Sequence, residues 1–187
     1  KLKEGSGRIE VVLEQEAVNF PATDDGYVLN SYVAHGTTEV RVYDGTKKMD
    51  IGTQGSLNEG EYYITFDPAS DEHNIDVNLT SVTTTTGDHY YDIIPQTQSN
   101  TYFVDGVSTT RTIIKMLDGS GDPVEMAFAN LTISAKPYDK AKPQYLQKKK
   151  ITYSVGKAGS PAKTVKLESD DYQISYGTND AIVSAQT

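Results

Sequence analysis

Alternation of apolar and polar residues is the feature that most constrains this chain, because it suits strands and not helices. The clearest example is EVRVY at residues 39–43, in which the two valines fall on one face and the charged residues on the other. One apolar, buried face and one polar, solvent-exposed face are typical of an antiparallel sheet that packs on a partner layer. No segment shows a convincing helical period, so we expect an all-β chain.

Short runs rich in Val, Ile, Thr and Tyr recur along the sequence, and each run ends at Gly, Asp, Asn or Pro. Asp24-Asp25-Gly26, Asp44-Gly45 and Asp105-Gly106 are turn signals, because Gly accepts a positive φ and Asp hydrogen-bonds to the local backbone. Many short strands with turns at this spacing predict a sandwich or a barrel. The predicted strands are residues 8–13, 17–20, 27–33, 39–43, 48–51, 61–66, 75–84, 89–94, 109–116, 127–135 and 149–155.

Three segments between these strands carry expectations of their own. The sequence DGSGDP at 118–123 predicts a turn that joins 109–116 to 127–135 as a hairpin. Residues 67–74 and 95–107 are polar and weakly patterned, so we expect surface loops there. We expect the second loop to carry a recognition surface, because binding residues gather on loops that a rigid scaffold positions.

The domain organisation follows from these strands. We predict an immunoglobulin-like antiparallel β-sandwich over residues 8–155, preceded by a connection at 1–7. Residues 163–187 alternate again but are too few to form a core, so they predict the start of a second β module. We expect this last segment to pack little against the first module.

A joint is predicted between the two modules at residues 156–162. Gly156 and Gly159 give the backbone freedom, and Pro161 stiffens the exit from the joint.

Because the chain begins at Lys1 and not at Met, we expect a processed product or an excerpt of a longer chain.

Charge is unevenly distributed in this acidic chain. The net charge is −9, which argues against a general nucleic-acid binder. Residues 136–157 hold seven Lys and one acid, which leaves 10 basic and 25 acidic residues elsewhere (17 minus 7 and 26 minus 1). We interpret the basic stretch as a solvated connection and a strand edge protected by Lys, with a docking patch as the alternative.

No apolar run approaches the roughly 20 residues of a membrane helix, so we expect no membrane insertion.

The sequence carries no catalytic signature. The chain has no Cys, which excludes disulfides and thiolate metal sites. Gly156-Lys157-Ala158-Gly159-Ser160 has the letters of a phosphate-binding loop in the wrong order, and no dinucleotide, zinc-protease or serine-hydrolase motif occurs. We therefore expect no enzyme and no cofactor.

Histidines and loop carboxylates are the residues of this sequence that could bind a metal ion. His35, His73 and His89 each stand alone in sequence, so spacing gives a zinc site no support, and we interpret them as surface or edge residues. Calcium prefers loop carboxylates, but neither acidic turn has the order of an EF-hand, so we interpret the acids as solvated, with calcium as the alternative. The acids are Asp118, Asp122 and Glu125 in one turn and Asp67, Asp71, Glu72 and Asp76 in the other.

Aromatic residues supply the candidate contact surface. The chain has 13 Tyr against four Phe and no Trp, and Tyr combines an apolar ring with a polar tip that suits contact with sugars or proteins. Half-buried strand faces are the alternative role, and the one we favour. The candidate contact residues are Tyr90, Tyr91, Tyr102 and Phe103.

Two stretches of the chain resemble a known family. The segment VVLEQEAVNFPATDDGYVLNSYVAHGTTEVRVYDGTKKM at 11–49 resembles β-sandwich modules of bacteriophage tail-tip and tail-fibre proteins. ITYSVGKAG at 151–159 is similar to the exit from one such module to the next, and AKTVKLESDDYQISY at 162–176 looks like the opening of that next module. The residues that carry the first match are Glu16, Pro21, Ala22, Asp25, Gly26, Val28, Val40, Val42, Tyr43 and Gly45.

The resemblance implies a structural virion protein with no enzymatic activity. We expect a rigid module of a phage tail tip or tail fibre, extracellular when assembled, which spaces or carries receptor-binding parts. The expected partners are other tail proteins, further copies of this chain, with a trimer favoured, and a host surface polysaccharide or protein. A bacterial adhesin repeat or a carbohydrate-binding sandwich is the alternative, and a tail-associated glycosidase fragment is the third hypothesis.

Overall fold

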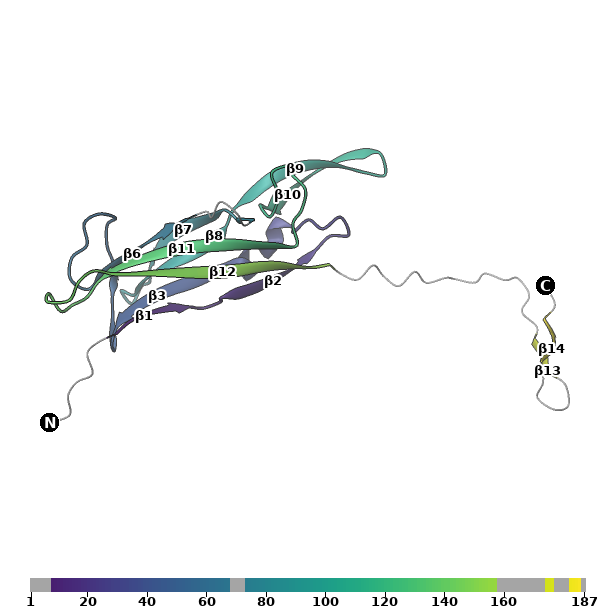
Figure 1. Ribbon diagram of the computed structural model, residues 1–187. Helices are drawn as coiled ribbons and strands as arrows, with labels where there is room; N and C mark the ends of the chain where they lie inside the picture. The colour runs from purple at the N-terminus through teal and green to yellow at the C-terminus, as the bar shows by residue number, and fades with distance from the viewer. Residues whose placement is uncertain (1–7, 68–72, 158–173, 177–181, 186–187) are drawn as a thin grey trace.

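Two β-sheets packed face to face form the body of the chain in the computed structural model, which describes residues 8–67, 73–157, 174–176 and 182–185 (Figure 1). The first sheet has the order β1 (Ile9–Leu13), β3 (Thr38–Asp44), β8 (His89–Pro95), β7 (Val77–Thr83), and β4 (Lys47–Lys48) also pairs with β3. The second has the order β2 (Ala17–Ala22), β12 (Tyr145–Lys157), β11 (Met126–Lys136), β6 (Glu61–Phe66), β5 (Asp50–Ile51).

The strand order of the body is that of an immunoglobulin sandwich. Such sandwiches place their strands as A-B-E-D in one sheet and as C-F-G in the other. The order β1-β3-β8-β7 corresponds to the first sheet and β6-β11-β12 to the second. The prediction of an all-β sandwich is confirmed. It is not purely antiparallel, because β2 runs parallel to β12 and β5 runs parallel to β6.

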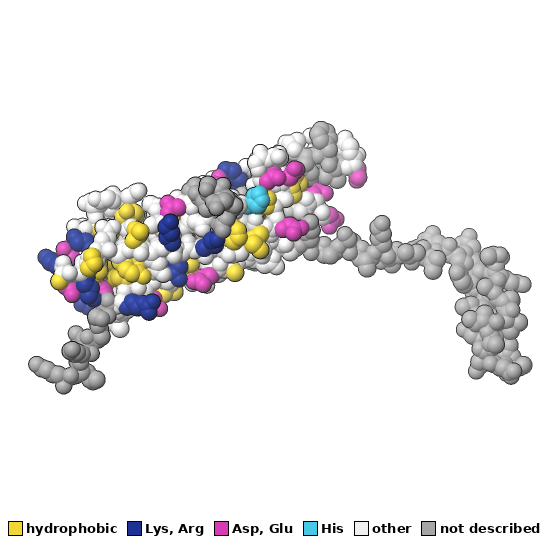
Figure 2. Space-filling view, in the orientation of Figure 1, with side chains coloured by type: hydrophobic (Ala, Val, Ile, Leu, Met, Phe, Trp, Pro, Cys, Tyr) yellow, Lys and Arg dark blue, Asp and Glu magenta, His cyan; other side chains and the backbone are white. Residues whose placement is uncertain are grey.

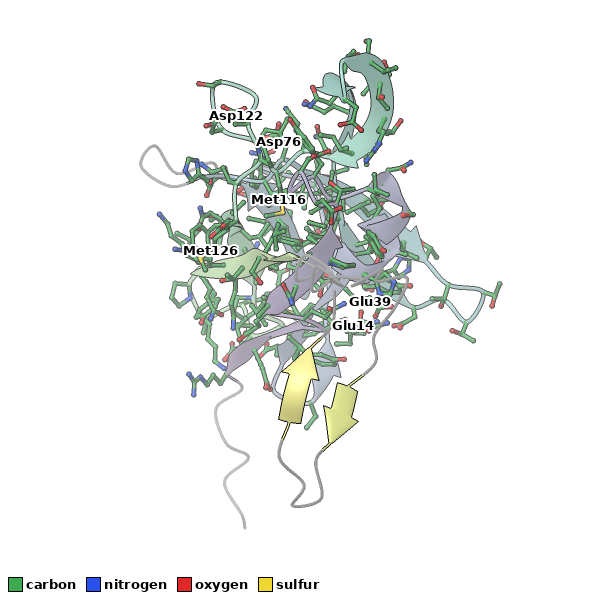
Figure 3. All side chains as sticks on the ribbon, turned by 90° about the vertical axis from the view of Figure 1, so that its right-hand side faces the viewer. Glu14, Glu39, Asp76, Met116, Asp122 and Met126 are labelled. Carbon is green, nitrogen blue, oxygen red and sulfur yellow. The ribbon has the colours of Figure 1, made fainter. Side chains whose placement is uncertain are left out.

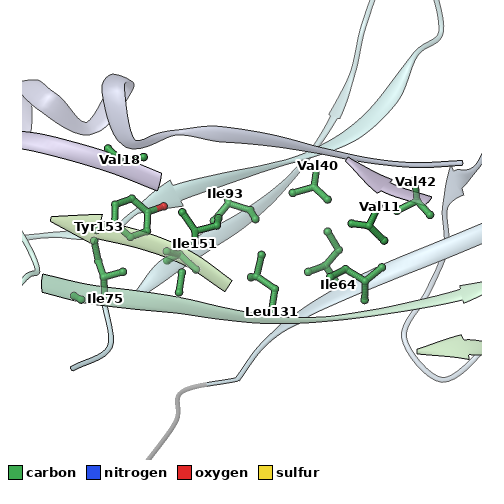
Figure 4. Packing of buried hydrophobic residues seen from close by; sticks show 14 of the residues in the cluster. Val11, Val18, Val40, Val42, Ile64, Ile75, Ile93, Leu131, Ile151 and Tyr153 are labelled. Carbon is green, nitrogen blue, oxygen red and sulfur yellow. The ribbon is translucent and has the colours of Figure 1, made fainter. Parts of the chain in front are cut away.

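The core lies between the two sheets and follows from the alternation in the sequence. Val40 and Val42 are fully buried, as the EVRVY pattern predicts. Side chains of the two sheets point toward one another in the interior (Figure 4). The rings of Phe20 and Tyr153 stack with their centroids 5.7 Å apart, which fills the end of the core near β2.

The strand predicted over residues 27–33 is wrong. The chain instead forms a 3₁₀ turn, η1 (Asn30–Tyr32), and one helical turn, α1 (Val33–Gly36). This turn brings Gly36 against the core, where the Tyr153 hydroxyl donates a 3.2 Å hydrogen bond to the Gly36 carbonyl oxygen. Val28 and Leu29 of the predicted strand keep strand-like roles: the Val28 carbonyl oxygen accepts the Ile114 N–H at 2.8 Å, and Leu29 forms an antiparallel bridge with Ile113.

The hairpin predicted across the 118–123 turn forms only next to the turn, where Leu117 and Pro123 make an antiparallel bridge and the Val124 N–H donates to the Met116 carbonyl oxygen at 3.1 Å. The turn forms, since the Asp118 N–H bonds to the Asp122 carbonyl oxygen at 2.8 Å. The strands on either side of it have other partners, however: β10 (Val107–Ile114) pairs with β9 (Thr97–Val104), and β11 pairs with β12 and β6. β9 occupies the segment expected to be a loop. It escaped prediction because its Thr, Ser, Asn and Gln side chains show no apolar alternation.

The strand predicted over residues 48–51 is split at Met49, where the chain crosses from β4 in the first sheet to β5 in the second. Near the other end of the body, β12 continues two residues beyond the predicted end of the module. Gly156 lies inside β12 and pairs with Pro21, so Gly156 itself is not a break in the chain. Gly159 and Pro161 lie outside the described residues, and the joint stays a prediction.

A separate two-stranded sheet follows in the sequence, formed by β13 (Ile174–Tyr176) and β14 (Ile182–Ala185). These strands agree with the renewed alternation after residue 163, while the second module stays a prediction. Among the described residues, no helix is long and apolar enough to cross a membrane.

Candidate functional site

A two-stranded arm, defined as β9 and β10, rises from the sandwich between β8 and β11 (Figure 1). Its strands pair without interruption from Thr97↔Ile114 to Val104↔Val107. A tight turn closes it, in which Asp105 has φ 50° and Gly106 has φ 78°; two positive φ angles are the signature of the type I′ hairpin turn. The arm stands clear of the body when the molecule is viewed along its length (Figure 3).

The base of the arm is anchored in the body. Ile113 and Ile114 are buried, Ile113 forms a bridge with Leu29, and the Ile114 N–H donates to the Val28 carbonyl oxygen. The outer part is exposed, with hydroxyl side chains at Ser99, Thr101, Ser108, Thr110 and Thr112 that all lie on one face of the hairpin. A surface of this kind offers hydrogen bonds and small apolar methyl groups.

Two observations describe the exposed surface of the arm further. The hydroxyls of Thr101 and Thr110 hydrogen-bond to each other across the strands at 2.8 Å. Val107, beside the turn, is 64% exposed, which is the highest exposure among the large hydrophobic residues of the described chain. The arm therefore presents an apolar side chain at its tip and hydroxyls along its sides.

The four aromatic candidates do not form one surface. Tyr90 and Tyr91 lie on β8, whereas Tyr102 and Phe103 lie on β9, and the side chains of the last two are outside the described part of the chain. Tyr91 points into the sandwich, where its ring meets that of Tyr62 edge to face with centroids 5.8 Å apart. Its role is therefore structural, as favoured for the Tyr residues.

Tyr90 belongs to an ionic cluster on the outer face of the first sheet, which the sequence did not reveal. The Arg41 guanidinium lies 4.3 Å above the Tyr90 ring and donates to Glu39 at 2.8 Å. Arg41 and Lys48 both pair with Asp88. Burial, and then the nearby Arg41 charge, lower the pKa of Lys48. The ion pairs of the cluster connect β3, β4 and the residue just before β8, so the role of the cluster is structural.

Carboxylates on the same face are crowded. Glu39 is the cross-strand neighbour of Asp92, and the Glu14 N–H donates to the Glu39 carbonyl oxygen at 3.0 Å; Glu14 and Glu39 are labelled in Figure 3. Burial, followed by the charges of Glu39 and Glu14, raises the pKa of Asp92. Glu39 is paired with Arg41.

The basic stretch forms a strip on the first half of β12. β2 pairs with β12 only from Thr152 onward, so Lys148, Lys149 and Lys150 lie where β12 has no second partner strand among the described residues. This is the arrangement of a strand edge protected by Lys. Lys149 pairs with Glu16 at 3.2 Å, and the Lys150 ammonium lies 4.4 Å above the Phe128 ring.

A shallow cavity of about 390 Å³ lies beside this strip and is lined in part by Asp67, Asn130 and Thr132. Lysine side chains and hydrophobic side chains alternate over this face of the body (Figure 2). The Thr132 hydroxyl donates to the Asp67 carboxylate, so an acid shares the cavity with the lysines. The docking patch stays a hypothesis.

The acidic turn at residue 118 is stabilised by its own backbone. The Asp118 carboxylate accepts the N–H groups of Ser120 and Asp122 at 2.8 and 2.9 Å, and these bonds lower the pKa of Asp118. In the second acidic turn, Asp76 pairs with Lys115, while Asp71 and Glu72 lie outside the described residues. No group of three potential metal ligands occurs in the described ranges.

The three histidines lie apart from one another. His35 packs against the ring of Tyr32 at 5.9 Å, and His89 lies 3.1 Å from the Thr83 hydroxyl. The His73 carbonyl oxygen accepts the Phe128 N–H at 2.9 Å, so this residue helps to attach its segment to β11. Each residue has a local structural contact.

Comparison of the chain with protein-family models, with curated proteins and with solved structures gives no match. Inferences about its function therefore rest on its own geometry and on the resemblance of its sequence patterns.

Proposed function

We propose that this chain is a structural and host-attachment component of a phage tail tip or tail fibre, in which a rigid sandwich spaces or carries receptor-binding parts. The proposal assigns the chain no catalytic activity and no cofactor. It places the chain in the virion, extracellular when assembled, beside other tail proteins, further copies of itself and a host surface polysaccharide or protein. The sequence patterns at 11–49 and 151–159 motivate it.

The observation that carries the proposal is where the chain enters and leaves the sandwich. β1 starts at one end of the elongated body, and β12 leaves at the opposite end, parallel to β2 (Figure 1). Chain ends of a single domain often lie close together. Entry and exit at opposite ends instead suit modules joined in series along a fibre, because each module then adds its full length to the spacer.

The arm adds a second supporting feature. It projects from the side of the body, and the bond from Ile114 to Val28 and the bridge between Ile113 and Leu29 attach its base at a defined position. A spacer that carries an exposed element at a defined position fits attachment better than it fits catalysis.

Immunogold electron microscopy tests the proposal. Antibodies raised against this chain are applied to purified tailed particles and to cells from one culture that carries the gene and releases particles. We expect gold at the tail end of the particles, and peptides of the chain in their mass spectra. Purified particles that carry neither gold nor peptides would overturn the proposal.

A bacterial surface adhesin or carbohydrate-binding module is the second candidate function, and the exposed hydroxyls of the arm favour it. Gold on the cell envelope, with unlabelled particles, supports this candidate. Binding of the isolated chain to defined glycans on an array, lost in the Thr101→Val/Thr110→Val variant, supports it independently.

A further inference from the structure

Beyond its anchored base, the arm has an open strand edge on both sides, because within the described part of the chain β9 and β10 form a sheet of only two strands. In an antiparallel ladder closed by the Val104↔Val107 pair, every second residue directs its N–H and C=O outward. These residues are Ser99, Thr101 and Phe103 on β9 and Ser108, Thr110 and Thr112 on β10. Ile114 is the next residue in this series on β10. Its N–H donates to Val28 and not to β9, which confirms that the N–H groups of the series point away from the partner strand.

A two-stranded hairpin is marginally stable in water by itself, so open edges of this length favour a further strand. Natural proteins protect open edges with Lys, Pro, bulges or very short strands. Most edges of this sandwich have such protection: Lys148–Lys150 on β12, Pro21 on β2, the exposed Glu10 on β1, and a length of two residues for β5. The outward positions of the arm have none of these, and its register shows no bulge.

The distribution of charge favours the arm over the body as the place where two copies of the chain meet. Residues 97–114 contain one acid, Asp105, and one base, Arg111, so the arm is neutral. The rest of the chain keeps 25 acidic and 16 basic residues (26 minus 1 and 17 minus 1) and therefore the whole charge of −9. Two copies of the chain repel each other through their bodies and not through their arms.

The reach of the arm makes such a contact possible. From Ser99 to Val104 the strand spans roughly 17 Å at about 3.4 Å per residue. This exceeds the Debye length of about 8 Å at physiological ionic strength, so two arms that meet near their tips can keep the acidic bodies beyond most of the range of their repulsion.

We propose that the β9–β10 arm is a self-association element, in which an open strand edge pairs with the open edge of the arm of a second copy of this chain. Main-chain hydrogen bonds of strand addition supply the affinity, and hydroxyl side chains meet across the new pair. The proposal deepens the proposed function, on which it rests for its setting, because it names the surface that joins copies within a tail.

The outer edge of β7 is the main competitor. It is also uncharged, but it belongs to the body, between Asp76 and Asp88 in sequence. Pairing of two β7 edges would bring the acidic bodies into direct contact, which the charge argument disfavours. The experiment therefore places one Lys on each open edge of the arm and, in a separate variant, one Lys on β7.

Sedimentation velocity of the full chain over roughly a hundredfold concentration range tests the proposal. We expect reversible association of the unchanged chain. Thr101→Lys/Thr110→Lys puts a charge on each open edge of the arm, and we expect it to raise the dissociation constant about tenfold or more. Thr101→Ser/Thr110→Ser keeps the hydroxyls, and Thr80→Lys puts the charge on β7; both should associate like the unchanged chain.

Three outcomes overturn the proposal: an unchanged chain that is monomeric throughout, association that survives the double Lys change, or equal loss of association in the Thr80→Lys variant. The far-UV circular dichroism spectrum and unfolding midpoint of each variant verify folding of the body, and amide hydrogen exchange at Thr109 and Arg111 verifies that the arm stays paired, because two Lys at the directly opposed positions 101 and 110 repel each other. A monomeric chain would leave the immunogold result intact, so failure of this inference and failure of the proposed function are distinguishable.

Disulfide trapping supplies an independent measurement, because the chain has no Cys of its own. Thr101→Cys and Thr110→Cys chains are oxidised separately and as a mixture, and Thr80→Cys serves as the control. A covalent dimer in any arm arrangement, formed well above the control, supports the proposal and identifies the paired edges. Yields no higher than those of the control contradict it.

Discussion

The hydroxyl of Tyr62 donates a 3.2 Å hydrogen bond to the carbonyl oxygen of Val40, and this bond joins the second sheet to the first across the core. Tyr62 lies on β6 and is fully buried, and Val40 lies on β3 and is fully buried too. A buried hydroxyl without a partner is costly, so the bond determines how the sheets sit against each other as well as adding stability. Tyr153 makes the equivalent bond to Gly36 at the other end of the core.

Tyr62→Phe removes this bond and leaves the apolar ring in place. We expect the free energy of unfolding to fall by about 1–2 kcal/mol, because the Val40 carbonyl oxygen loses a buried donor. Urea denaturation followed by circular dichroism measures the change. Tyr63→Phe is the matched control, since Tyr63 is the neighbour on the opposite face of β6; a loss as large as that of Tyr62→Phe would contradict the role given to the hydrogen bond.

The alkaline stability of the chain follows from the same two tyrosines. Burial is the main cause that raises the pKa of Tyr62 and of Tyr153 above the ordinary value of about 10. Below about pH 10 both residues are protonated in the folded and the unfolded chain, and their contribution is constant. Above that pH the unfolded chain releases protons that the folded chain retains, so the free energy of unfolding decreases as pH rises.

Urea denaturation at several values between roughly pH 9 and pH 11 measures this slope. We expect Tyr62→Phe and Tyr153→Phe each to make the slope shallower, and the double change to make it shallower than either single change does. An equally steep slope in the double variant would show that other groups cause the alkaline loss.

The prediction from sequence succeeded where one face of a strand is buried and failed elsewhere. β3 and β6 were found because Val40, Val42 and Ile64 alternate with polar residues, and burial of one face is what selects such a pattern. β9 was missed because the arm buries neither face along most of its length, so no apolar period marks it. Its turn, Asp105-Gly106, was read from the sequence because the φ requirement is local.

Long-range partners could not be read from local patterns. The sequence indicated a turn at 118–123 but not that the strands flanking it belong to different sheets, because pairing depends on which edges remain open after the body forms. The ionic cluster of Arg41, Lys48 and Asp88 was missed for the same reason. These residues come from three segments, and each alone looks like a solvated charge.

Gly36→Ala tests the packing between α1 and the core. A Cβ at this position would lie 2.9 Å from Phe20 Cε1 and from Pro95 Cγ, closer than real Cβ atoms approach. Phe20 is stacked on Tyr153 and has little room to move, so we expect a loss of about 1–3 kcal/mol from overpacking. Gly119→Ala is the control, because its Cβ would meet no atom within 4 Å. Equal stability of the two variants in urea would contradict this packing.

Gly106→Ala is expected to destabilise the arm and leave the sandwich unchanged. Gly106 has φ 78°, a conformation that costs Ala about 1 kcal/mol or more, and the type I′ turn requires it. The outer part of the arm contacts little besides itself, so it opens as a local unit without global unfolding. Amide hydrogen exchange should therefore accelerate roughly fivefold at Thr109 and Arg111, which pair with β9, and remain unchanged at Leu131, which pairs on both sides.

The matched control for this change is Gly121→Ala, because Gly121 also has a positive φ, 89°, in a turn outside the arm. We expect it to affect its own turn and to leave exchange at Thr109 and Arg111 unchanged. If Gly106→Ala accelerates exchange at Leu131 as much as at Thr109, the arm and the sandwich unfold together, and the arm is part of the cooperative core. If exchange accelerates in the arm alone, the hairpin is an independent unit whose edges are available to a partner while the body stays folded.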